Sequence, residues 1–169
     1  ILVLILFSVM VGALHGWLIA KIRIPAFVVT LCGLLGYRGL AQTMTHDTAI
    51  GYYDAKFNVE GIERLLTGKI FGLPAAFITF IAICLIVYYL LHLSVFGRYL
   101  LALGRNEQAA RYSGINTILI MAFAYIICSV LAAVSALFFA LYTADVVPSI
   151  HGNFFELYAI AGAVLGGCS

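Results

Sequence analysis

The sequence predicts an all-α protein built as a polytopic bundle of membrane-spanning helices. Of its 169 residues, 64% are hydrophobic and only 9% are charged, whereas about a quarter of the residues in soluble proteins are charged. The mean hydropathy is +1.13. The apolar runs reach roughly 20 residues, the length that a helix needs to cross about 30 Å of hydrocarbon. No run alternates polar and apolar residues as the strands of a membrane barrel do.

Two helical spans are predicted in the first quarter of the chain. The first covers residues 1–20, where Gly12 and Gly16 form a small-xxx-small pair that lets another helix approach closely. The second covers residues 26–45 and follows Pro25, a residue suited to the first turn of a helix. Its glycines recur every three residues and predict a smooth packing stripe, formed by Gly33, Gly36 and Gly39.

The remaining spans follow a long polar connection. Residues 46–72 form this connection, within which Asn58 is expected to cap an interfacial helix that ends near Gly68. A third span runs from Pro74 to about Phe96, a fourth from Thr117 to about Thr143, and a fifth begins near Phe154. Because the chain begins and ends inside apolar runs, we expect residues 1–169 to be a single transmembrane domain truncated at both ends, with about four complete spans.

Loop charges predict the orientation. One group of loop residues carries five basic side chains and one acid, Glu107; the basic residues are Lys21, Arg23, Arg98, Arg105 and Arg111. Residues 46–72 carry three basic residues and four acids. The positive-inside rule therefore places the first group in the cytoplasm and residues 46–72 outside. A net charge of +2 without a basic tract gives no indication of nucleic-acid binding.

The segment 97–116 is a polar, glycine-punctuated loop between two uncharged spans. Asn106 is a good N-cap, Glu107 complements the helix dipole, and Gly114 suits a left-handed position after the helix. We therefore predict a helix of about two turns, with Gly97 and Gly104 giving it freedom to change its angle. Its paired alanines offer a smooth surface to a partner. The alternative is a solvated loop whose basic residues serve only topology.

The run GRYLLALGRNEQAARYSGIN resembles the cytoplasmic motif of permease subunits of bacterial ABC importers of the ribose/xylose type. Further similarity lies at Ile24–Leu31, Arg38–Ala41, Gly72–Pro74 and Glu156–Gly167, in the same order along the chain. The resemblance implies a coupling element for the ATPase, formed by Gly104, Arg105, Asn106, Glu107, Ala109, Ala110, Ser113 and Gly114. Arg105 replaces a frequent glycine and Cys168 a usual threonine; Arg105 is a candidate for tuning which ATPase is accepted.

The resemblance also implies the assembly around the chain. Such importers sit in the bacterial inner membrane and combine two permease copies, a cytoplasmic ATP-binding subunit and a periplasmic sugar-binding protein. The chain would then be a multi-pass permease, surrounded by lipid, that moves a monosaccharide inward without binding ATP or another cofactor itself. The sequence contains no phosphate-binding GxxxxGK[ST] motif and no Ser/His/Asp or HExxH pattern, so we do not expect an enzyme.

Two ionisable residues near the outer side are predicted to line the translocation path. Arg38 lies within the second span, and a charge at that depth costs about 2.5–3.5 kcal/mol unless it faces protein or water. Glu156 opens the fifth span, and we hypothesise an ion pair between the two. Interfacial snorkelling of each side chain is the alternative. The polar residues around Pro148 form an outer turn that either contacts solute or is an ordinary loop; these residues are Asp145, Ser149, His151 and Asn153.

The remaining polar candidates have no pattern of a reactive centre. His15 and His92 have no partners spaced for catalysis or a metal triad, so we predict structural roles and no metal site. The four cysteines lie in apolar spans at spacings that match no zinc or redox motif. A gradient-driven transporter or channel would place carboxylates in mid-span, and the complete spans have none. A membrane scaffold that only binds partners is a third class. Solute flux in liposomes would separate it from both transporter classes.

Overall fold

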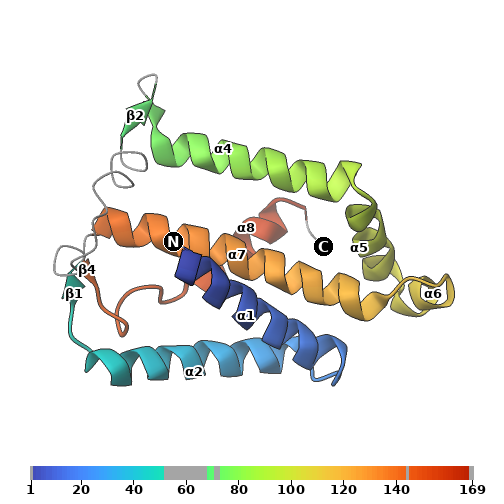
Figure 1. Cartoon of the computed structure of the whole chain (residues 1–169), viewed down its shortest axis with the longest axis horizontal. Helices are drawn as coiled ribbons and strands as arrows, with labels where there is room; N and C mark the ends of the chain where they lie inside the picture. The colour runs from blue at the N-terminus through green and yellow to red at the C-terminus, as the bar shows by residue number, and fades with distance from the viewer. Residues whose placement is uncertain (1, 52–67, 71–72, 144, 168–169) are drawn as a thin grey trace.

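The computed structural model describes residues 2–51, 68–70, 73–143 and 145–167. The helices are α1 (Leu2–Ala20), α2 (Ala26–Thr45), α4 (Ala75–Tyr88), the π-helix η1 (Tyr89–Leu93), α5 (Val95–Arg105), α6 (Glu107–Tyr112), α7 (Thr117–Thr143) and α8 (Phe155–Leu165). Four two-residue strands form two small antiparallel pairs: β1 (Ile50–Gly51) with β4 (Asp145–Val146), and β2 (Lys69–Ile70) with β3 (Leu73–Pro74). Helices α1, α2, α4 and α7 run roughly along the long axis of the molecule (Figure 1).

The all-α membrane prediction is confirmed. In the described part of the chain, three helices are long and apolar enough to cross a membrane: Leu2–Ala20, Ala75–Leu93 and Thr117–Thr143. Helix α2 has 20 residues but is less apolar, because Arg38 and Gln42 lie within it. It begins directly after Pro25, as the sequence predicts. The interfacial helix expected near residues 58–68 lies almost entirely outside the described residues.

Helices α1 and α7 approach so closely that two positions on α1 admit no side chain. A Cβ atom built at Gly12 would lie 2.7 Å from Ile126 Cα, and one at Gly16 would lie 2.7 Å from Ala122 Cα. Ser129 on α7 also donates a hydrogen bond of 2.7 Å to the Ser8 carbonyl. The predicted small-residue contact is therefore confirmed, and α7 is its partner.

The glycine stripe on α2 has only one neighbour among the described residues. A Cβ at Gly33 would lie 2.7 Å from His15 Nε2, whereas at Gly36 and Gly39 no heavy atom lies within 4 Å. The expected close packing is thus wrong for Gly36 and Gly39 within this part of the chain. The reason is geometric, since α1 reaches only the first part of the stripe.

The third predicted span ends earlier than expected. Helix α4 continues through the π-helix η1 to Leu93, and Ser94 then adopts an extended conformation with φ −91° and ψ 160°. The Ser94 side chain accepts a hydrogen bond from Gly97 N at 3.2 Å, which caps a new helix. The span therefore ends three residues before Phe96, because a serine cap restarts the chain in another direction.

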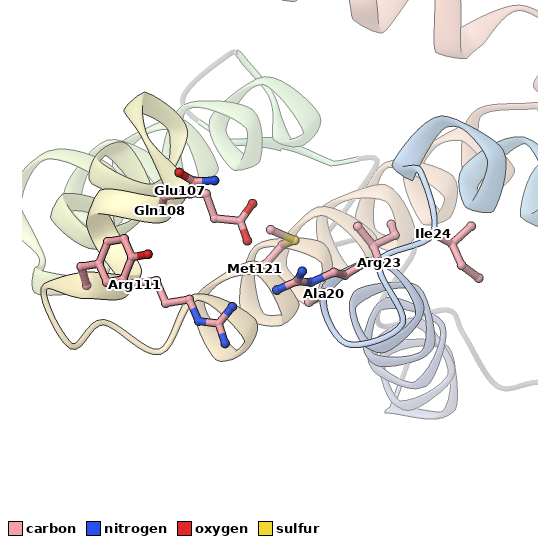
Figure 2. A pocket seen from close by; sticks show the side chains of 9 residues that line it. Ala20, Arg23, Ile24, Glu107, Gln108, Arg111 and Met121 are labelled. Carbon is pink, nitrogen blue, oxygen red and sulfur yellow. The ribbon is translucent and has the colours of Figure 1, made fainter.

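Loops gather at the two ends of the helices as the alternating topology requires. At one end, Ile50 pairs with Val146 and Gly51 with Asp145, and Ser149 N donates to Asp47 Oδ1 at 3.2 Å. At the other end, residues 21–25 lie near α6 and the start of α7 (Figures 1 and 2). The basic residues of the α1–α2 turn and of α6 thus lie at the opposite end of the helices from the β1–β4 pair.

Candidate functional site: the α5–α6 connection and the outer turn

The segment that carries the coupling motif folds as two helices joined at Asn106. Asn106 is extended, with φ −158° and ψ 104°, and its side chain accepts a hydrogen bond from Ala109 N at 3.0 Å. Helix α6 follows with Glu107 in its first turn and ends before Gly114, whose φ is +81°. A positive φ favours glycine because other residues strain there. The predicted cap, first-turn acid and left-handed glycine are all confirmed.

Helix α5 is the part of the segment that the sequence prediction missed. Its inner positions are Phe96, Gly97, Leu100 and Leu103, a spacing of three and four residues that was available in the sequence. Gly97 is buried, and a Cβ there would lie 2.6 Å from the Leu90 carbonyl oxygen. This glycine thus permits a close contact with the preceding π-helix, while its predicted hinge role stays a prediction. Gly104 has no such neighbour.

The two alanines of α6 face in different directions. Ala110 is only 4% exposed, whereas Ala109 is exposed to solvent. The expected surface of paired alanines is therefore wrong, because Ala110 faces the protein and leaves Ala109 as the small residue of the outer face. Every other residue of the predicted coupling element is exposed; these are Gly104, Arg105, Asn106, Glu107, Ser113 and Gly114.

An open cavity of about 690 Å³ lies between α6 and the turn from α1 to α2. Figure 2 shows Glu107 and Arg111 on α6 and Arg23 on the turn pointing into it from opposite sides. None of the three forms an ion pair among the described residues. Charged side chains of α6 therefore face the turn between α1 and α2, a proximity that the sequence analysis did not predict.

At the opposite end, Arg38 binds the outer turn through a different partner from the one expected. Its Nη1 atom donates to Asn153 Oδ1, and Asn153 Nδ2 donates to the Ser149 carbonyl at 2.8 Å. No ion pair joins Arg38 to Glu156, although both residues are described. The hypothesised pair is absent because Glu156 lies in the exposed first turn of α8, where its charge complements the helix dipole.

The outer turn is largely stabilised by its own polar side chains. His151 Nδ1 accepts a hydrogen bond from Val147 N at 2.9 Å, and its ring meets Phe139 edge-on at 5.5 Å. Gly152 and Phe154 both have positive φ angles, of 77° and 64°. Ser149, His151 and Asn153 thus shape the loop, as an ordinary structured turn requires.

The other sequence candidates lie on helix surfaces. His15 Nε2 is 3.2 Å from the Tyr37 hydroxyl, beside an apolar groove of about 380 Å³ between α1 and α2. His92 stacks on Tyr88 with ring centroids 4.7 Å apart. Cys32, Cys84 and Cys128 are free thiols, and Cys168 lies outside the described residues. No group of three His, Cys, Asp or Glu side chains within the described ranges is arranged to hold a metal ion.

Comparison with known proteins identifies the family. Residues 1–169 match the family described as branched-chain amino acid transport system / permease component. The chain is 34% identical over 161 residues to the ribose import permease protein RbsC of Escherichia coli strain K12, an alignment that covers 94% of this chain and 49% of that protein. It is 33% identical over 156 residues to the L-arabinose transport system permease protein AraH of the same strain, covering 92% of this chain and 45% of that protein.

A relative from another organism is also similar to the chain. The fructose import permease protein FruF of Bifidobacterium longum is 30% identical over 171 residues, covering 100% of this chain and 47% of FruF. The chain spans about half the length of these curated relatives. No solved structure matches it. The match over the whole sequence shows that the chain belongs to this family of transport-system permease components.

Proposed function

We propose that the chain forms part of the membrane pathway of an importer that moves a monosaccharide across the bacterial inner membrane, driven by ATP hydrolysis on a separate cytoplasmic subunit. The observation that carries the proposal is α6, a short and exposed helix beside long apolar helices. Its ends are defined by the Asn106 cap and by Gly114. A helix of this kind presents a fixed surface to a partner in water.

The outer face of α6 is the proposed contact for the ATP-binding subunit. Ala109 is exposed there, and Ala110 anchors the opposite face in the protein. Arg105 lies at the end of α5, next to the cap, where it is placed to affect which ATPase is accepted. The small Ala109, with the charged Arg105 nearby, favours insertion of the helix into a groove with a polar rim.

Movement of α6 has a direct route into the membrane domain. Helix α6 is followed after four residues by α7, and α7 is in backbone contact with α1 at Gly12 and Gly16. Such a close contact makes α1 and α7 a unit that moves together more readily than it separates. ATP-driven displacement of α6 would therefore reorient this unit and alternate access to the path.

The outer end is the proposed side of solute entry. A periplasmic binding protein would meet the turn that Arg38 and Asn153 hold together. Arg38 and Glu156 remain predictions for the path, and a second permease copy is proposed to complete it.

The relatives support a sugar as the solute, because the three compared here are named for ribose, arabinose and fructose. The family description names branched-chain amino acids instead, which makes these the second candidate class. Uptake of radiolabelled ribose, arabinose and leucine by cells that express the permease with its native partners separates the two. Uptake of leucine alone would exclude the sugar proposal.

The coupling proposal is tested by enlarging the small residue on the outer face of α6. Ala109→Trp is expected to abolish both ATP-driven uptake and co-purification of a subunit with a nucleotide-binding motif, while the amount of permease in the membrane stays unchanged. Leu119→Trp is the matched control, since Leu119 on α7 is 53% exposed and lies outside the coupling element. Full uptake and full co-purification in Ala109→Trp would refute the assignment.

A further inference from the structure

A second cavity, of about 200 Å³, lies beside the start of α7 on the basic side of the molecule. The side chains of Lys21, Arg23 and Arg111 line it, and they come from the α1–α2 turn and from α6. One carboxylate, that of Glu107, opposes these three cations, and no ion pair joins it to any of them. The cavity therefore has a net positive charge that the described residues do not neutralise.

The polar groups at the N-terminus of α7 also face this cavity. Thr117 lines it and is only 7% exposed. The N–H groups of Thr117 and Ile118 have no backbone acceptor in the same residues, since Asn116 bonds to Leu119 and Ile120 instead. Free N–H groups at the start of a helix are hydrogen-bond donors open to a ligand or to water.

The position of the cavity indicates where its ligand comes from. It lies where α1 ends at Ala20 and where the 27-residue apolar helix α7 begins. Trp17, one turn from the end of α1, has Lys21 Nζ 6.0 Å from its ring centroid. Tryptophan and lysine together are typical of the membrane–water interface, the depth at which lipid headgroups lie.

We propose that this cavity binds a phosphate group, with Arg23 and Arg111 as its cationic ligands and the start of α7 as its hydrogen-bond donor. Guanidinium groups and helix N-termini are the two protein features best suited to phosphate oxygens. A water takes about 30 Å³ in the liquid, so a cavity of 200 Å³ has room for a phosphate and bridging waters. The interfacial depth makes an acidic phospholipid headgroup the favoured source and a soluble phosphate the alternative.

The test measures lipid retention by the intact permease, independently of transport and of any ATPase. The permease is placed in nanodiscs of phosphatidylcholine with or without phosphatidylglycerol, and retained phosphatidylglycerol is counted by native mass spectrometry. At about fivefold in affinity per basic residue at a membrane surface, the double variant Arg23→Gln/Arg111→Gln should bind about twenty-five-fold more weakly. Glu107→Gln should bind more tightly because it removes the opposing charge.

Arg98→Gln is the matched control, because Arg98 is an exposed arginine on the same side that lines neither cavity. Its retention of phosphatidylglycerol should equal that of the wild type. In a second arm, inorganic phosphate is titrated into the permease in phosphatidylcholine nanodiscs; saturable binding that the double variant loses would support the site with a soluble source. Equal phosphatidylglycerol retention in wild type and double variant, together with no phosphate binding, would overturn the proposal.

Discussion

The contact between α1 and α7 should respond sharply to single methyl groups. Non-bonded carbon atoms are normally about 3.5–4.0 Å apart, whereas a Cβ at Gly12 or Gly16 would lie 2.7 Å from a backbone Cα atom of α7. Each substitution to alanine therefore forces the two helices apart by about 1 Å. Overpacking of this kind costs about 1–3 kcal/mol per site.

The same displacement breaks a hydrogen bond. The distance from Ser129 Oγ to the Ser8 carbonyl is 2.7 Å, and lengthening it by about 1 Å removes the interaction. Its loss adds about 0.6 kcal/mol, the average for such bonds between membrane helices. We therefore expect Gly12→Ala and Gly16→Ala each to lower the free energy of unfolding by about 1.6–3.6 kcal/mol.

The assay is the unfolding of the purified intact permease in mixed micelles with increasing dodecyl sulfate. Gly36→Ala is the matched control, since the same methyl group meets no heavy atom within 4 Å in the described part of the chain. The two α1 variants should unfold at clearly lower denaturant fractions than this control. If both variants unfold at the same dodecyl sulfate fraction as the wild type, the close contact of α1 and α7 does not exist as described.

Three further perturbations test other contacts. Asn106→Ala should remove the cap of α6, cost about 1 kcal/mol, and weaken co-purification of the ATPase, whereas Asn106→Asp should retain it; equal capture by both variants would contradict the role of the cap. Arg38→Ala and Asn153→Ala should be non-additive in unfolding experiments, with a coupling energy of about 0.5–3 kcal/mol, and simple additivity would argue against their contact. Gly97→Ala should destabilise the permease because the new methyl group meets backbone carbonyls, while Gly104→Ala should not, as measured by thermal unfolding of the two proteins in parallel.

Features decided by local chemistry were predictable from the sequence. The helix start after Pro25, the Asn106 cap and the left-handed Gly114 each depend on a few neighbouring residues. The full extent of α7 follows from its uninterrupted apolar run. Such signals need no knowledge of what packs against them, because backbone geometry and solvation decide them within one or two turns.

Features decided by distant contacts were not predictable in the same way. Gly97 resembles a hinge in the sequence, yet its burial depends on the carbonyls of the preceding π-helix. Similarly, nothing near Arg38 in the sequence indicates that Asn153, 115 residues away, is its partner. That choice follows from the shape of the outer turn, which bends through positive φ angles at Gly152 and Phe154.

Helices α7 and α2 connect the two ends of the molecule, and they differ in how closely they pack against α1. Helix α7 links the coupling segment to the outer turn and is locked to α1 by direct backbone contact. Helix α2, by contrast, meets α1 at Gly33 and is tied to the outer turn through Arg38. Under the proposed function, a displacement that enters at α6 would reach the outer turn along α7, and the Arg38–Asn153 contact would pass it on to α2. That contact would then be the point at which movement of α6 changes access from the opposite end of the helices.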